Sequence, residues 1–137
     1  MKIRVIDYGG GMPERQHYND AGADVRALKD AYIPGCGTKA LPLGIGLRVP
    51  DGYAAYVMPR SGLASKGFFC QIPPIDSGYT GEIHAIVTNA NQTERLVKAG
   101  DRIGQLVVMP IAVCDFIRDD EETNERGAGG LGSTGVA

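Results

Sequence analysis

Glycine and proline divide this chain into short segments, and that division constrains its fold more than any other feature. The 137 residues include 20 glycines, eight prolines and no tryptophan, which points to many turns and short strands and against long helices. We expect strands over residues 3–7, 21–27, 44–50, 53–59, 81–90, 102–109 and 112–117, strand fragments over 31–43, and one helix over 61–67. Short strands at regular spacing predict an all-β jelly roll or β-sandwich with one short helix.

The length and the net charge of the chain limit the classes of protein to which it can belong. A chain of 137 residues suits one domain, which we divide into a body over 1–117 and a mobile, Gly-rich C-terminal arm over 118–137. A net charge of −2 gives no general attraction to nucleic acid or to an anionic membrane. We expect no membrane span and no secretory leader. Three cysteines without a CxxC pair fit a reducing cytoplasm.

The stretch IPPIDSGYTGEI (72–83) is the one around which the rest is organised. We expect a β-hairpin with Asp76, Ser77 and Gly78 in its turn and Tyr79 on the returning strand. Taken alone, Asp76 can be a turn former and nothing more. Three other stretches, PRSGLASKG (59–67), GDRIGQLVV (100–108) and RGAGGLGSTG (126–135), are rich in Gly, Ser and Arg. They are suited to holding a polyphosphate, beside which Asp76 would be the acting carboxylate.

Two of these stretches have a structural alternative. Arg60 and Ser61 stand where a strand gives way to the expected helix, and free N–H groups with a forked cation favour an anion there. The alternative is that Ser61 only caps the helix. Gln105 can orient a phosphate or a metal-bound water, whereas Asp101 and Arg102 are expected to form an ion pair.

The tail and Asp24 also allow two interpretations each. A Gly-rich tail can be a linker or a lid, and Arg126, Ser133 and Thr134 favour a lid over phosphates. Asp24 can support the water shell of a metal or be the outward residue of an alternating strand. The two histidines lack partners at metal-ligand spacing, so a zinc site is not expected. A P-loop sequence is absent.

The stretches AGADVRA, PRSGLASKG, IDSGYTGEI, GDRIGQLVV and RGAGGLGSTG occur in the order of the five signature motifs of the trimeric dUTP pyrophosphatases (dUTPases). The chain resembles that family from about residue 21 to residue 135. The resemblance implies a jelly-roll homotrimer with three active sites, each built from all three subunits. It implies Mg²⁺-dependent hydrolysis of dUTP to dUMP and pyrophosphate, which lowers dUTP and supplies dUMP for thymidylate synthesis.

The resemblance also implies roles for single residues. Asp76 would activate the water that attacks the α-phosphorus, and Tyr79 would lie against the deoxyribose and exclude a 2′-OH. Asp24 would support the water shell of a magnesium ion that has no direct protein ligand. The other substrate-binding residues would be Arg60, Ser61, Gly62 and Gln105 at the phosphates, Cys70, Pro74, Ile75 and His84 around the nucleoside, and Arg126, Gly130, Leu131, Gly132, Ser133 and Thr134 in the arm.

Three positions depart from the family pattern. Cys70 stands where members commonly carry a uracil-contacting Asn, Pro73 replaces the usual Gly, and Leu131 stands where many have Phe. These departures concern affinity and base recognition more than the reaction type.

Two other functions compete with this one. A dCTP deaminase would need a glutamate ten residues after the hairpin Asp, and this chain has Ile86 there. A non-catalytic nucleotide-sensing or partner-binding trimer would not need Asp76, Arg60 or the intact tail.

Overall fold

A computed structural model of the chain describes residues 1–121 and 125–136. The elements in chain order are β1 (Arg4–Asp7), β2 (Ala23–Arg26), β3 (Ala31–Ile33), β4 (Thr38–Pro42), β5 (Ile45–Arg48), β6 (Tyr53–Met58), α1 (Ser61–Ala64), β7 (Phe68–Gln71), β8 (His84–Asn89), β9 (Arg95–Val97) and β10 (Arg102–Pro110). No helix in the described ranges is long and apolar enough to cross a membrane.

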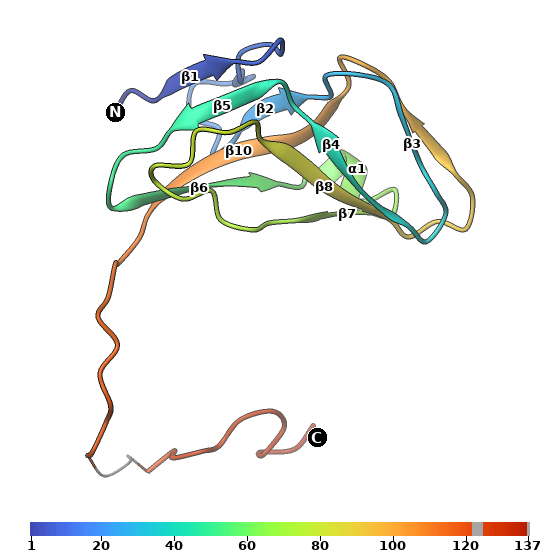
Figure 1. The fold of residues 1–137 in the computed structure, drawn as a ribbon. Coiled ribbons are helices and arrows are strands. Elements are labelled where there is room, and N and C mark those ends of the chain that lie inside the picture. The colour runs from blue at the N-terminus through green and yellow to red at the C-terminus, as the bar shows by residue number, and fades with distance from the viewer. Residues whose placement is uncertain (122–124, 137) are drawn as a thin grey trace.

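The strands form a jelly roll, which confirms the expected fold class. Two three-stranded sheets, β2-β10-β6 and β4-β8-β7, make up most of the body, and the pairs β1-β5 and β3-β9 extend it. All strand pairs of these sheets are antiparallel. The body is elongated, with the β3-β9 pair at one end (Figure 1).

The core lies where apolar residues of the two larger sheets meet. Strand β8 alternates, so Ala85 and Val87 are buried while the residues between them are not. They belong to one apolar cluster with Val57 of β6 and Leu106 of β10. Burying one such larger side chain contributes about 1.5–3 kcal/mol. The core therefore fixes β6 and β10, on which the site described below depends.

Asn89 is a buried polar residue that organises the turn after β8. Its side chain is 0% exposed. Its Nδ2 donates to the carbonyls of Ile33 (3.2 Å) and Thr93 (2.9 Å), and its Oδ1 accepts from the N–H of Asn91 (2.9 Å). These hydrogen bonds satisfy the polar atoms of a fully buried side chain.

A β-bulge interrupts the pairing of β10 with β2. Gly104 pairs with Val25, but Arg102 pairs with Arg26, so Ile103 is the extra residue. Ile103 is 3% exposed and belongs to the core. The bulge places Arg102 on the same face of the sheet as Gln105, which a regular ladder would not do.

The structure differs from the sequence-based expectations in four places. The helix ends at Ala64 rather than at residue 67, and Arg60, not Ser61, is its N-cap residue. The hairpin over 72–83 is wrong: among the described residues Ile75 pairs instead with Ala55 in an isolated bridge. Strands β7 and β9 were not predicted. The strand expected over 112–117 is also wrong, since the structure assigns none there.

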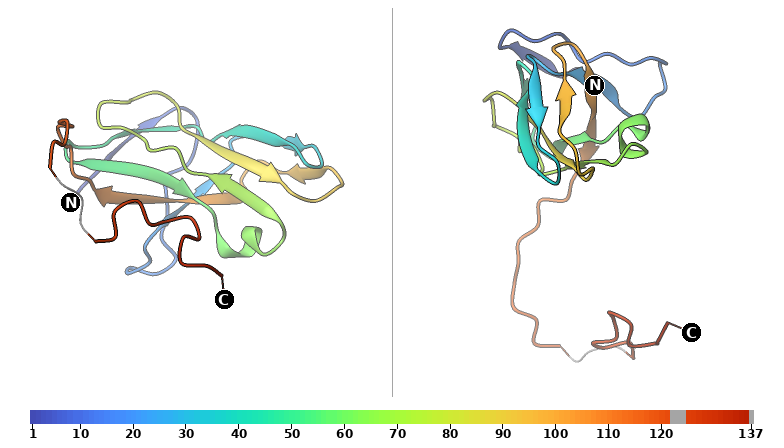
Figure 2. Two further views of the ribbon diagram at one scale, coloured as in Figure 1. Left: turned by 90° about the horizontal axis from the view of Figure 1, so that it is seen from below. Right: turned by 90° about the vertical axis from the view of Figure 1, so that its right-hand side faces the viewer.

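The chain leaves the body after β10. Figures 1 and 2 show the residues beyond Pro110 leading away from the sheets. Val113, Phe116 and Ile117 are 82%, 97% and 89% exposed in this segment. The body of the chain therefore does not cover these apolar side chains.

Candidate active site

Strand β10 brings three distant stretches to one place. It lies between β2 and β6, and Gln105 pairs with Asp24 on one side and with Met58 on the other. Arg60 and Ser61 follow directly after β6. Together with the loop before β2 they line a cavity of about 320 Å³, named here the phosphate pocket, whose lining residues are Gln16, His17, Asp20, Ala21, Gly22, Asp24, Arg60, Ser61, Gly62 and Gln105.

Asp24 is the buried centre of an ionic cluster in this pocket. Its Oδ1 lies 2.9 Å from Nε of Arg60, and its Oδ2 lies 3.5 Å from Nη1 of Arg102. Gln16 Nε2 donates to the same Oδ2 at 3.3 Å. The expectation that Arg102 pairs with Asp101 is wrong, because the bulge turns Arg102 to Asp24. Asp24 is likewise not an outward residue, since it is only 9% exposed.

The cluster fixes the guanidinium of Arg60. Nε donates to Asp24, and Nη1 donates to the carbonyl of Arg102 at 3.4 Å. A guanidinium has five N–H groups, so several remain for another anion. Arg60 is therefore held in place and still able to bind a phosphate.

Gln105 is positioned by a hydrogen bond and by a glycine. Its Nε2 donates to the carbonyl of Pro59 at 2.9 Å. A Cβ on Gly22 would lie 2.4 Å from Oε1 of Gln105 and 2.8 Å from its Cβ. Only glycine at position 22 leaves Gln105 this room.

A larger cavity of about 780 Å³ adjoins this pocket and shares Arg60 with it. Its lining carries five basic side chains and one acidic one: Arg26, Arg60, Lys66, Arg95, Arg102 and Asp101. The potential on this side of the body therefore favours anions.

Asp76 lies in a second cavity of about 260 Å³, named here the nucleoside pocket. Its walls are mostly apolar, with the lining residues Val57, Gln71, Pro73, Pro74, Ile75, Asp76, Tyr79, Glu82, Ile83, His84 and Ile86. The carboxylate of Asp76 accepts no hydrogen bond from a described residue, so it is free to act on a ligand.

A tight turn aims this carboxylate. The N–H of Tyr79 donates to the carbonyl of Asp76 at 3.2 Å, and Gly78 has a φ of 87°, as the third residue of a type II turn requires. The hydroxyl of Tyr79 donates to the carbonyl of Glu82 at 3.1 Å. A Cβ on Gly81 would lie 2.5 Å from that hydroxyl, so glycine at this position seats the tyrosine ring.

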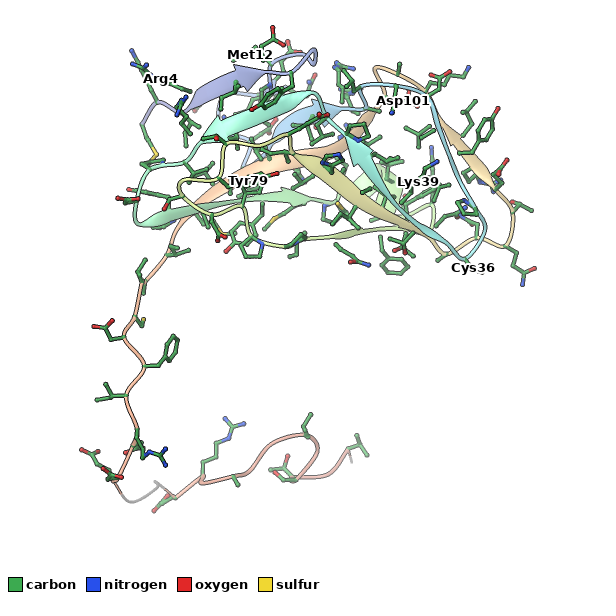
Figure 3. The ribbon with its side chains drawn as sticks, viewed as in Figure 1. Arg4, Met12, Cys36, Lys39, Tyr79 and Asp101 are labelled. Atoms are coloured by element: carbon green, nitrogen blue, oxygen red, sulfur yellow. The ribbon has the colours of Figure 1, made fainter. Side chains whose placement is uncertain are left out.

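The two pockets of one chain are separate. They share no lining residue. The turn is attached to β6 where Ile75 pairs with Ala55, whereas Arg60 lies just beyond the end of that strand. In Figure 3, Tyr79 lies in the half of the body from which the arm departs, and Asp101, beside the large cavity, lies in the other half.

The remaining residues predicted for the site lie elsewhere. Cys70 packs on the core side of β7, with its Sγ 3.5 Å from the carbonyl of Val57, and burial raises the pKa of its thiol. It lines neither of the two pockets. The arm residues Arg126, Gly130, Leu131, Gly132, Ser133 and Thr134 line a hollow made by the arm itself.

Sequence reasoning missed several residues that line the pockets. Gln16 and Gly22 contact functional side chains, but nothing in their local pattern marks them. Gln71 and Glu82 face the nucleoside pocket. Their proximity to Asp76 in the sequence was a usable signal, because residues flanking a turn often line the same pocket.

The donor set fits a metal carried by a ligand and not one held by the protein alone. No group of three His, Cys, Asp or Glu residues within 1–121 and 125–136 is arranged to hold an ion. Asp20 and Asp24 line the phosphate pocket. The backbone N–H of His17 lowers the pKa of Asp20; desolvation opposes this effect, and the His17 ring and Arg15 contribute smaller decreases. The lining of this pocket therefore contains carboxylate oxygens, the kind of group that suits the water shell of Mg²⁺.

Comparison with known proteins identifies relatives over nearly the whole chain. The sequence model of the dUTPase family matches residues 10–135. The deoxyuridine 5′-triphosphate nucleotidohydrolase of Tropheryma whipplei (strain Twist) is 38% identical over 141 residues, covering 98% of this chain and 96% of the relative.

Solved structures show the same fold. The dUTPase of Staphylococcus bacteriophage 80alpha, a mutant with bound dUpNHpp, superposes with a TM-score of 0.90 at 24% identity and covers 98% of this chain and 99% of that one. A mutant dUTPase from phage phi11 of S. aureus, studied for the coordination of a structural Mg(II) ion, has a TM-score of 0.83 at 22% identity, covering 88% and 98%.

Proposed function

This chain belongs to the dUTPase family and hydrolyses dUTP to dUMP and pyrophosphate, and from that premise we propose how its pockets divide the reaction. The nucleoside occupies the nucleoside pocket with Asp76 and Tyr79. The triphosphate occupies the phosphate pocket with Arg60, Ser61 and Gln105. The observation that carries this assignment is the division of chemistry: one pocket has apolar walls and a free carboxylate, and the other has a cation, a hydroxyl and an amide.

Asp76 is the general base in this proposal. Its carboxylate takes a proton from a water molecule, whose oxygen forms a bond to the α-phosphorus. The bond from that phosphorus to the bridging oxygen breaks, and pyrophosphate leaves with the electron pair. A positioned base supplies about 10²–10⁴-fold, and the free, turn-held carboxylate of Asp76 fits this role.

The phosphate pocket stabilises the charge that develops on the triphosphate. Arg60 is fixed by Asp24 and by the carbonyl of Arg102, so it need not reorganise during the reaction. Ser61 offers a hydroxyl, and Gln105 an amide held by Pro59. Removing one such preorganised donor costs about 10²–10³-fold in rate.

Tyr79 and the apolar walls define the nucleoside. The tyrosine ring, seated by Gly81 and the carbonyl of Glu82, lies against the deoxyribose and leaves no room for a 2′-OH. Pro74 and His84 would contact the uracil, whereas the N–H and carbonyl of Ile75 are both bonded to Ala55, so Ile75 would contribute only its side chain to the wall. These assignments are supported by the lining of the pocket.

Magnesium enters with the substrate in this proposal. Such an ion would supply charge neutralisation at the triphosphate. Asp20 and Asp24, which line the phosphate pocket, are the residues that would support its water shell.

We further propose a homotrimer in which each site combines parts of different subunits. The supporting observation is that the two pockets of one chain share no lining residue, because Asp76 must reach the α-phosphorus of a triphosphate held by Arg60. The nucleoside pocket of one subunit would face the phosphate pocket of a second. The exposed apolar segment with Val113, Phe116 and Ile117 would pack on a neighbouring subunit and carry the arm to close a site.

The three free thiols support a reducing compartment such as the cytoplasm.

A mixing experiment tests the shared site. Asp76→Asn and Arg60→Ala each inactivate a homotrimer, but a mixed trimer regains a site wherever Asp76 of one chain meets Arg60 of another. Random mixing restores about one quarter of the sites. Activity that stays at the level of the separate variants would place the whole site within one chain.

The role of Asp76 is tested by its neutralisation. We expect Asp76→Asn to bind dUTP as a trimer and to lose pyrophosphate release by about 10²-fold or more. Asp51→Asn is the matched control, because Asp51 accepts from Ser77 in the same turn (3.1 Å) but lies outside both pockets. Near-normal turnover by Asp76→Asn would remove Asp76 from its role. Parallel assays with dUTP, dTTP, dCTP and UTP test the substrate assignment.

A further inference from the structure

Glu82 carries a buried acceptor that the protein leaves unused. Its Oε1 is the one buried side-chain nitrogen or oxygen without a hydrogen-bond partner among the described residues. No described residue donates to either of its carboxylate oxygens. An unmet buried polar atom costs about 1–3 kcal/mol, and more when it is charged. A group kept at this cost calls for a partner that comes from outside the chain.

Glu82 lies between two cavities. It lines the nucleoside pocket together with Asp76 and Tyr79, and it also borders a cavity of about 610 Å³ whose lining includes Lys29 and Lys39. Its backbone carbonyl accepts the hydroxyl of Tyr79 at 3.1 Å, which ties the residue to the nucleoside pocket. His84, the first residue of β8, lines the nucleoside pocket as well.

The chemistry of the ligand narrows the choice further. A carboxylate accepts hydrogen bonds and donates none. The nucleoside part of dUTP has two donors, the N3–H of uracil and the 3′-hydroxyl of the sugar. Because Glu82 is linked to Tyr79 and the uracil lies against Pro74 and the side chain of Ile75, the 3′-hydroxyl is the nearer donor.

We propose that Glu82 is a further substrate-positioning residue whose carboxylate accepts a hydrogen bond from the 3′-hydroxyl of the deoxyribose. The inference rests on the proposed placement of the nucleoside in this pocket. The bond holds the sugar against Tyr79 and so fixes the direction in which the α-phosphate leaves the pocket toward the water activated by Asp76. A hydrogen bond to a charged acceptor of this kind is among the stronger ones in proteins.

The test is a thermodynamic cycle that removes the carboxylate of Glu82 from the protein and the 3′-hydroxyl from the substrate, singly and together. Glu82→Met keeps the length of the side chain and removes the acceptor, and 2′,3′-dideoxyuridine triphosphate lacks the 3′-hydroxyl. We expect Glu82→Met to lower kcat/KM for dUTP by roughly 10- to 100-fold. We expect it to leave kcat/KM for the dideoxy substrate within about twofold of the wild-type value. Glu94→Met, at an exposed position outside both pockets, is the control and should change neither.

Measurements of stability distinguish a substrate-positioning role of Glu82 from a structural role. Removing an unpaired buried carboxylate should leave the unfolding midpoint and the trimer unchanged or raise the midpoint. Equal losses on both substrates, or a Glu82→Met variant that loses stability or subunit assembly, would overturn the proposal. A loss confined to analogues lacking the N3–H would also overturn it. Absence of dUTP hydrolysis by the unaltered protein would instead refute the proposed function.

Discussion

Replacing Gly22 by alanine tests how the phosphate pocket is built. The added Cβ would lie 2.4 Å from Oε1, 2.8 Å from Cδ and 2.8 Å from Cβ of Gln105. The Cβ of Gln105 is fixed by the backbone of β10 and cannot move away, so the loop that carries residue 22 must separate from β10. Overpacking of this kind costs about 1–3 kcal/mol, and losing the hydrogen bond from Gln105 to Pro59 adds about 1 kcal/mol. We therefore expect the free energy of unfolding to fall by about 2–4 kcal/mol.

The activity should fall more selectively than the stability. Gln105 would no longer present its amide to the substrate phosphates, so kcat/KM for dUTP should fall by about 10- to 100-fold. Denaturant unfolding and pyrophosphate release measure the two effects. Gly11→Ala is the control, because a Cβ there meets nothing within 4 Å. In a Gln105→Ala background, Gly22→Ala should lower kcat/KM little further. Full activity of Gly22→Ala, or an undiminished loss in that background, would refute the reasoning.

The other predictions concern the core and a thiol. Asn89→Ala removes two donated and two accepted hydrogen bonds, so we expect unfolding in denaturant to show a loss of about 2–4 kcal/mol, whereas Asn91→Ala should cost less. Burial raises the pKa of Cys70 above the ordinary value of 9.0. The stability that depends on its neutral thiol is therefore fully present below pH 9.0 and lost as pH rises through the raised value. Melting curves of wild type and Cys70→Ala at pH 8 and 10 should converge or cross, and iodoacetamide should label Cys70 more slowly than the exposed Cys36 and Cys114. Equal labelling rates would contradict this assignment.

Most strands were predictable because their sequence pattern matches what burial requires. Alternation in β8, and turn residues such as Pro50 and Gly52, depend on local chemistry that a sequence displays. Strands β7 and β9 were missed. Each has only half-buried and exposed residues, so little apolar contrast distinguishes it from a loop.

The errors near the site come from long-range pairing. Residues 72–75 were expected to pair with 79–83, but Ile75 finds Ala55 instead, and no local signal encodes that choice. Arg102 was assigned to its neighbour Asp101, whereas the bulge at Ile103 turns it to Asp24. Which residues gather in the phosphate pocket was predictable from the motifs. Their separation from Asp76 on the single chain was not.

The two pockets are anchored to the body very differently. On the phosphate side, Gln105 is paired with neighbours on both sides in the middle strand of a three-stranded sheet, so its strand comes apart only when the sheet does. The turn carrying Asp76 is attached to β6 by one isolated bridge and elsewhere by two side-chain hydrogen bonds, from Ser77 to Asp51 and from Tyr8 to the carbonyl of Thr80, so a local opening can release it. Amide hydrogen exchange around residues 76–81 should accordingly be fast while that of β10 approaches the global limit. An enzyme arranged in this way can let a nucleoside enter and leave by local breathing, at no cost to the geometry that grips the triphosphate.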